Sequence, residues 1–215
     1  MVRLTADPTL SIIVPLRDGD ELTEGCRRGL TLNRAFDPDR ELIMECGGNA
    51  KGLQAAALNR GIRKATGRYV IMLGADTEAF AGIFDQLIDH LIAHPEAAYA
   101  YCGYRRSGKL SGVCPGQTFD LDKLSWGNYI WTSAVCHRQD LLDVPLNESP
   151  EVERLVDWEQ WRRLAIRGRF GVWLDTIGFD TSFKDGDISL RDDADYAAAV
   201  DAVNLAVDAE RKSCP

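Results

Sequence analysis

The chain has 215 residues, of which 45% are hydrophobic and 27% charged, and its formal net charge is -8 at pH 7. This composition is that of an ordinary globular protein and excludes the disordered and fibrous classes. The acidic balance disfavours broad binding to nucleic acid or anionic membranes, because such binding needs a clustered basic surface, although a small local nucleic-acid site stays open.

The sequence shows no targeting or membrane signal. No window approaches the ~20 apolar residues that span a bilayer, and residues 1–15 lack the basic start and long apolar run of a signal peptide. We therefore expect no transmembrane segment and a cytoplasmic location. The six cysteines form no C-x-x-C pair, which argues against zinc-ribbon and thioredoxin-like chemistry.

Strand and helix patterns alternate through the first hundred residues. Short apolar, β-branched runs predict strands, whereas alanine-rich or amphipathic stretches predict helices. The periodicity is strongest after Phe80, where apolar residues recur on one helical face. The expected elements are strand Leu10–Leu16, helix Glu21–Phe36, strand Glu41–Met44, helix Lys51–Thr66, strand Tyr69–Leu73, a helix from Phe80 and strand Tyr99–Cys102.

The second half of the chain is less regular. Residues Gly103–Ser125 are polar and glycine-rich and predict an irregular segment. Helices are expected at Arg138–Leu142, Leu155–Arg167 and Asp193–Arg211, with a strand at Val172–Leu174. The whole pattern predicts one α/β domain over residues 1–215, with a mainly parallel open sheet covered by helices on both faces.

Polar turns follow three of the predicted strands. Arg17–Asp18 comes after the first strand, Glu45–Cys46 ends the second, and Gly74–Asp76 comes after the third. Each turn alone is explained equally well by the backbone needs of aspartate and glycine. In an open parallel sheet, however, the carboxyl ends of the strands meet at one edge, where ligands bind. The three turns therefore predict a shared crevice.

These features resemble the family-2 glycosyltransferases, whose nucleotide-diphospho-sugar domain has the GT-A fold. The resemblance covers roughly Leu10–Leu174. Its most specific part is Gly52–Asp76, which is similar to the family's Asn-x-Gly, Ala-x-Gly, aromatic strand and aspartate motif. The other matching segments are Ser11–Pro15, Thr132–Ala134 and Asp157–Leu164.

The resemblance implies inverting transfer of a sugar from a nucleotide-sugar donor, with residues 1–76 as the nucleotide-sugar half and residues 77–215 as the acceptor half. Asp157 would be the catalytic base. Asp76 matches the last aspartate of the family's Asp-x-Asp motif and would hold Mn2+ or Mg2+, with Asp187 as a second ligand. A purely structural role remains open for both principal residues, since Asp157 could complement a helix start and Asp76 could cap a turn.

The resemblance also predicts which residues surround the two substrates. The expected donor-binding residues are Pro15, Arg17, Glu45, Asn59, Ala75 and Asp76. Trp126 and Trp131 are candidates to stack on the acceptor, although core packing explains such aromatic residues equally well. Saccharide, lipid, protein, nucleic-acid and small-molecule acceptors all stay open, as does the oligomeric state.

The sequence departs from the family pattern at the donor site. Glu45 and Cys46 stand where paired aspartates are common, Leu58 replaces an arginine, and Gly74 replaces the first aspartate of the metal motif. Two hypotheses follow: a transferase adapted to an unusual donor, or a catalytically silent binding protein. The retention of both Asp76 and Asp157 favours the enzyme.

Two other groupings have weaker functional interpretations. His90 and His94 are four residues apart on a predicted helix and could share zinc, but no acidic partner of the H-E-x-x-H kind accompanies them. Cys136 beside His137 could suggest a thiol nucleophile, yet ordinary residues near a helix start explain the pair better.

Overall fold

The computed structural model describes residues 9–47, 53–183 and 193–214. Within these residues, eight strands form one sheet in the order β2-β1-β3-β7-β5-β8-β4, with β6 paired to β5. The strands are β1 Leu10–Leu16, β2 Arg40–Cys46, β3 Tyr69–Met72, β4 Thr77–Ala79, β5 Tyr99–Gly108, β6 Gly112–Cys114, β7 Val135–His137 and β8 Gly171–Phe183.

The sheet is mixed but mainly parallel, as the sequence predicts. Strand β1 pairs in parallel with β2 and β3, and β5 pairs in parallel with β8. Strand β7 is antiparallel to both β3 and β5, so β1, β2, β3, β5 and β8 all run in one direction. Their carboxyl ends consequently lie at one edge of the sheet.

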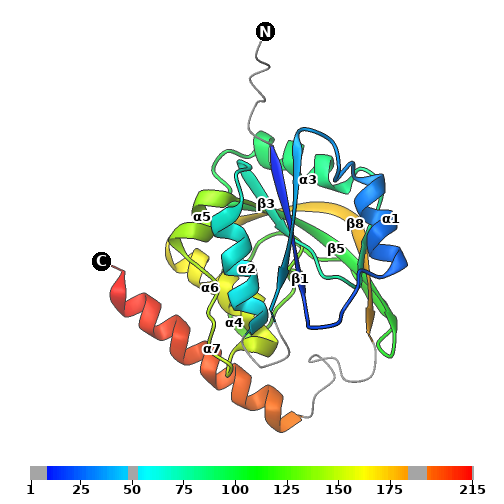
Figure 1. Ribbon diagram of the computed structural model, residues 1–215. Helices are drawn as coiled ribbons and strands as arrows, with labels where there is room; N and C mark the ends of the chain where they lie inside the picture. The colour runs from blue at the N-terminus through cyan, green and yellow to red at the C-terminus, as the bar shows by residue number, and fades with distance from the viewer. Residues whose placement is uncertain (1–8, 48–52, 184–192, 215) are drawn as a thin grey trace.

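Helices cover both faces of the sheet (Figure 1). On one face, α1 and α3 pack over a core that includes Leu30, Phe84 and Leu87. On the other, α2 and the helices of the second half enclose a core that includes Tyr99 and Trp161. The helices are α1 Glu24–Leu32, α2 Leu53–Lys64, α3 Ile83–Ala93, α4 Leu121–Trp126, α5 Arg138–Asp143, the 3-10 turn Glu153–Leu155, α6 Val156–Ile166 and α7 Asp193–Ser213.

The C-terminal helix α7 lies along the outside of α6 (Figure 1). Glu210 of α7 pairs with Arg163 at 3.0 Å and with Arg167 at 2.5 Å, and both arginines belong to α6 or its end. Within the described ranges, no helix has the length and hydrophobicity that a membrane crossing needs.

The prediction of an irregular segment over Gly103–Ser125 is wrong. Strand β5 continues to Gly108 and pairs along its whole length with β8, which itself extends far beyond the predicted Val172–Leu174. Arg105 on β5 binds Asp180 on β8 at 2.6 Å. Tertiary pairing with a long neighbouring strand thus overrides the weak strand propensity of these polar residues.

Helix α1 is shorter than the predicted Glu21–Phe36 because side chains fix both of its ends. Thr23 caps the first turn by accepting a hydrogen bond from the Cys26 N–H. Asn33 ends the helix: its buried amide donates to the carbonyls of Gly29 and Phe80 and accepts from the Phe84 N–H. Asn33 therefore also ties α1 to the start of α3.

Helix α2 packs closely on β1 because Gly61 has no side chain. A Cβ at Gly61 would come within 2.5 Å of the Ile13 Cγ2 atom, a separation that a buried aliphatic side chain cannot relieve without moving. Gly25 in α1 offers a contrast, since a Cβ there meets only the flexible Glu78 side chain at 3.3 Å.

We therefore expect Gly61→Ala to destabilise the protein by roughly 1–3 kcal/mol, because overpacking of the core outweighs the gain in helix propensity. Chemical denaturation measures the change. Gly25→Ala is the matched control and should be neutral or slightly stabilising. Equal effects of the two substitutions would contradict the close packing of α2 on β1.

Candidate active site

A cavity of about 200 Å³ lies at the edge of the sheet where the carboxyl ends of the parallel strands meet. Its walls come from the ends of β1, β3 and β8, the start of β4, the N-terminal part of α2, the segment before β7 and the start of α6. The lining residues are Pro15, Arg17, Gln54, Leu58, Met72, Leu73, Gly74, Asp76, Thr77, Trp131, Thr132, Ser133, Glu153, Arg154, Val156, Asp157, Thr181 and Phe183.

The start of α1 holds the loop that carries Asp76. The Thr23 N–H and hydroxyl both donate to the Ala75 carbonyl, at 2.9 and 3.1 Å. The Cys26 thiol donates to the Gly74 carbonyl at 3.6 Å, and burial raises the pKa of this thiol to about 12. Cys26 is therefore a neutral structural donor, and it helps to fix Asp76 in the cavity wall.

Gly74 makes room for two oxygen atoms of the following residues. A Cβ at position 74 would lie 2.8 Å from both the Asp76 Oδ1 and the Thr77 Oγ1. These two atoms are 3.4 Å apart, and the Thr77 hydroxyl also lies 3.4 Å from that of Thr181 on β8. The departure from the family pattern at Gly74 thus gathers hard oxygen atoms at one point of the cavity.

Asp157 lies in the first turn of α6 and faces the same cavity. Its carboxylate accepts hydrogen bonds from the Thr132 hydroxyl at 3.0 Å and from the Trp158 N–H at 2.8 Å. Burial raises the pKa of Asp157 above its ordinary value, and these hydrogen bonds oppose the shift only in part. Burial thus makes Asp157 a stronger base than an exposed aspartate.

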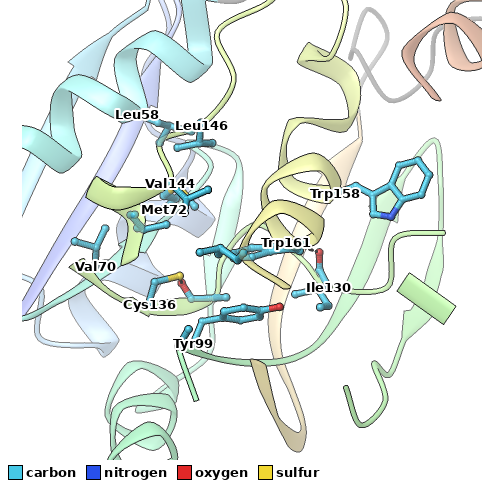
Figure 2. Packing of buried hydrophobic residues seen from close by; sticks show 14 of the residues in the cluster. Leu58, Val70, Met72, Tyr99, Ile130, Cys136, Val144, Leu146, Trp158 and Trp161 are labelled. Atoms are coloured by element: carbon cyan, nitrogen blue, oxygen red, sulfur yellow. Dashed lines mark hydrogen bonds between the residues drawn. The ribbon is translucent and has the colours of Figure 1, made fainter. Parts of the chain in front are cut away.

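Two buried tryptophans hold α6 against the sheet. Figure 2 shows Trp161 packed beside Tyr99 and Ile130; the Trp161 and Tyr99 rings stack with centroids 4.6 Å apart. The Trp161 indole donates to the Ile130 carbonyl at 3.2 Å, and the Trp158 indole donates to the Leu124 carbonyl at 2.6 Å. Helix α6 and the segment before β7 are therefore fixed to each other.

The predicted crevice forms from two of its three turns. Arg17, Gly74 and Asp76 line the cavity together. Glu45 does not line it: its buried side chain pairs with Lys64 at 2.5 Å and with Arg60 at 3.3 Å. The Lys64 ammonium holds the pKa of Glu45 below its usual range. The structure thus gives Glu45 ion pairs that join β2 to α2.

Asn59, another residue expected at the donor, also makes hydrogen bonds within the fold. Its buried amide donates to the Leu146 carbonyl at 2.9 Å and to Glu148 at 2.8 Å, and its oxygen accepts from the Leu146 N–H at 3.0 Å. The cavity walls include neither Asn59 nor its partners Leu146 and Glu148. The side chain instead joins α2 to the segment before α6.

The remaining predicted residues divide between the cavity and other places. Pro15 and Trp131 line it, whereas Ala75 lies in the adjacent loop with its carbonyl bound to Thr23. Trp126 ends α4, has 89% of its surface exposed and is absent from the cavity walls, so the structure gives no support to an acceptor contact there. Asp187 lies outside the described residues.

One face of the Trp131 ring is covered by a neighbouring side chain. It stacks on Tyr104 of β5, with the ring centroids 4.3 Å apart and the planes 25° from parallel. The expected stacking on an acceptor would therefore have to use the opposite face. Among the described residues, the Trp131 Nε1 atom is buried without a hydrogen-bond partner.

No group of three or more His, Cys, Asp or Glu side chains within residues 9–47, 53–183 and 193–214 is placed to hold a metal ion. His90 and His94 pack their rings against each other with centroids 4.5 Å apart, and their nitrogens contact the Trp173 and His90 carbonyls. Cys136 is buried in β7, and His137 is the N-cap residue of α5. Both pairs thus make contacts within the fold.

Several cavity residues escaped the sequence prediction. Thr181 and Phe183 lie on the part of β8 that was not expected, and Glu153 and Arg154 lie in the 3-10 turn before α6. Of these residues, only Glu153 could have been predicted to line the cavity, because it lies one helical turn before Asp157. A polar residue at that spacing faces the same side of a helix as the predicted base.

The chain is similar in sequence to a known protein family and in fold to solved structures. Residues 48–137 match the sequence profile described as Glycosyl transferase family 2. No curated protein sequence matches the chain. Among solved structures, S. aureus TarS 1-349 in complex with UDP-GlcNAc matches 92% of this chain with 11% identity and a TM-score of 0.66. The chain spans 66% of that fragment and 39% of the longer TarS chain.

Two further structures are similar over 97% of this chain. The mannosyltransferase PcManGT from Pyrobaculum calidifontis, in complex with GDP-Man and Mn2+, has 15% identity and a TM-score of 0.58, with 73% of its chain covered. Glucosyl-3-phosphoglycerate synthase from Mycobacterium tuberculosis, in complex with Mg2+ and UDP, has 10% identity and a TM-score of 0.57, with 81% covered. The likeness shows a shared GT-A fold.

The roles of Asn59 give a testable expectation for this site. Asn59→Ala should lower the free energy of unfolding by roughly 2–4 kcal/mol, because it leaves the Leu146 carbonyl and N–H unpaired in the interior. Chemical denaturation measures this loss. Nucleotide affinity at a temperature where the variant stays folded should match the wild type; weaker nucleotide binding without loss of stability would restore Asn59 as a donor contact.

Proposed function

We propose that this chain transfers a sugar from a nucleotide-diphospho-sugar to an acceptor hydroxyl, with inversion and with the help of a divalent cation. The match of residues 48–137 to the Glycosyl transferase family 2 profile and the fold shared with solved glycosyltransferases support this proposal. The observation that carries the proposal is that Asp76 and Asp157, from opposite halves of the chain, line one cavity. The first has the chemistry of a cation ligand and the second that of a base.

The donor would occupy the side of the cavity formed by the first half of the chain. Pro15 and Arg17 line this side after β1, and Asp76 lines it after β3. Arg17 offers a positive charge to the diphosphate. The similar structures contain UDP-GlcNAc, GDP-Man and UDP, which supports a nucleotide-sugar donor in general without selecting its base.

The oxygen atoms around Asp76 fit Mg2+ or Mn2+. Asp76 Oδ1 and Thr77 Oγ1 lie close together beside Gly74, and Mg2+ commonly binds through one or two carboxylates with phosphate and water completing its shell. When bound, such a cation would neutralise charge on the departing nucleoside diphosphate. Asp187 remains a proposed second ligand.

Asp157 would act on the acceptor. Its carboxylate takes the proton of the acceptor hydroxyl while that oxygen forms a bond to the anomeric carbon and the bond from this carbon to the diphosphate oxygen breaks. Thr132 orients the carboxylate through its 3.0 Å hydrogen bond. The raised pKa of Asp157, caused by burial, favours acceptance of the proton.

A catalytically silent binding protein is the second candidate. The observation in its favour is that Leu58 and Gly74, both of which depart from the family pattern, line the cavity itself. An apolar side chain replaces a positive charge, and a glycine replaces a carboxylate. Ligand binding without turnover would follow if these changes leave the diphosphate held in an unreactive position.

Donor binding is tested by the melting temperature of the purified protein with nucleoside diphosphates and nucleotide sugars, each with Mn2+, Mg2+ or EDTA. We expect one nucleotide class to raise the melting temperature in a way that depends on the cation. The corresponding stabilisation of the folded state is about 2.7 kcal/mol at a ligand concentration one hundred times Kd. Asp76→Asn should abolish the cation dependence. The absence of any shift with every nucleotide would overturn the proposed donor.

Catalysis is tested by Asp157→Asn. This substitution should lower kcat by at least ~100-fold, since general-base catalysis contributes ~10²–10⁴-fold. Folding should survive, because burial penalises the charged carboxylate and the neutral amide can still accept from Thr132. Release of the nucleoside diphosphate in the presence of acceptor measures the rate. Unchanged turnover by a folded variant would refute the role of Asp157 as base.

The carboxylate of Asp157 also sets the pH dependence of activity. A base must be deprotonated, so activity is present above the pKa of Asp157 and is lost as the pH falls through it. Since burial raises that pKa, the acidic limb of kcat/KM should lie above the ~3.9 of an ordinary aspartate.

A further inference from the structure

The cavity wall contains three polar atoms that the fold leaves unsatisfied. The Trp131 Nε1, Ser133 Oγ and Glu153 Oε2 atoms are each buried and have no hydrogen-bond partner among the described residues. All three residues line the cavity, and Ser133 has only 2% of its surface exposed. Buried polar groups in proteins are almost always paired, and one left unpaired costs about 1–3 kcal/mol.

These three atoms belong to residues grouped around Asp157. Trp131 and Ser133 are the chain neighbours of Thr132, whose hydroxyl binds the Asp157 carboxylate. Glu153 lies one helical turn before Asp157. The hydrogen bond from Trp161 to the Ile130 carbonyl holds the segment that carries Trp131 and Ser133 to α6. The unsatisfied atoms are thus fixed near the base, on the acceptor side of the cavity.

Their chemistry defines the group that can satisfy them. The indole N–H only donates a hydrogen bond, the carboxylate oxygen only accepts one, and the serine hydroxyl does both. Neighbouring hydroxyl groups meet all three needs, because each hydroxyl both donates and accepts. An alkyl chain would leave every atom unpaired, and an ammonium group would leave the indole N–H unpaired.

We propose that Trp131, Ser133 and Glu153 form an anchor that binds neighbouring hydroxyl groups of a saccharide acceptor and presents one further hydroxyl to Asp157. The anchor deepens the proposed function and rests on it for the catalytic step, but saccharide binding itself does not need turnover. In this arrangement Trp131 contributes its N–H edge, since Tyr104 already covers one face of its ring.

Binding of simple sugars tests the anchor directly. The probes are methyl α- and β-glycosides of glucose, galactose, mannose and N-acetylglucosamine, titrated by saturation-transfer NMR with the full chain. We expect the wild type to bind at least one of them. Ser133→Ala removes one hydrogen bond, and Glu153→Gln replaces a charge-assisted bond with a weaker neutral one, so each should weaken that binding about 10-fold.

A matched substitution controls for charge and position. Glu151→Gln alters the same residue type two positions from Glu153, but the Glu151 side chain binds Ser149 and lies outside the cavity. It should leave glycoside binding unchanged. Melting temperatures of Ser133→Ala and Glu153→Gln should equal or exceed that of the wild type, because each removes or neutralises an unpaired buried group; a marked fall would show a structural role and overturn the anchor.

The melting temperature with nucleotides distinguishes failure of the anchor from failure of the proposed function. Glycoside binding that both substitutions weaken, with an unchanged nucleotide shift, supports the anchor. A wild type that binds nucleotide but none of the glycosides, or variants that bind them as well as the wild type, would overturn the anchor and leave the transferase proposal standing. Glycoside binding without any nucleotide shift would support the anchor and overturn the proposed donor.

Discussion

The position of α6 depends on two indole N–H groups, and the candidate site depends on α6. Trp161 is fully buried, stacks on Tyr99 of the central sheet and donates to the Ile130 carbonyl. Trp158 donates to the Leu124 carbonyl. Large aromatic side chains supply much of the burial energy of a core, and a buried indole N–H requires a partner. These requirements together bring the start of α6, which carries Asp157, to the carboxyl edge of strands that were formed by the other half of the chain.

The polar residues near this edge fall into two classes with different physical roles. Glu45 and Asn59 have all or most of their hydrogen-bonding capacity taken up within the fold, so they stiffen the frame around α2. Ser133 and the indole of Trp131 have none of theirs taken up among the described residues. A protein that tolerates such unpaired groups gives up stability at that place. Hydrogen-bond satisfaction therefore distinguishes the residues that stiffen the frame from those of the proposed anchor.

The sequence predicts the order of the main strands and helices because their apolar periodicity is long and regular, as in the strand Leu10–Leu16 and the helix after Phe80. It also selects Asp76 and Asp157 as candidate site residues, and both line one cavity. It fails where tertiary partners decide: β5 extends through polar residues only because β8 pairs with it, and β4 and β7 are three residues long, too short for any period to show. For a related reason, no sequence pattern reveals that Glu45 pairs with Lys64 or that Asn59 binds the Leu146 backbone.

The absence of a side chain at Gly74 determines where the oxygen atoms of Asp76 and Thr77 can lie. Any side chain at position 74 would press against the Asp76 carboxylate and the Thr77 hydroxyl, so it would move the oxygen atoms that define this corner of the cavity. Effects of substitutions in direct contact do not add. The effect of an aspartate introduced at position 74 would therefore be epistatic, because it would depend on which side chains stand at positions 76 and 77.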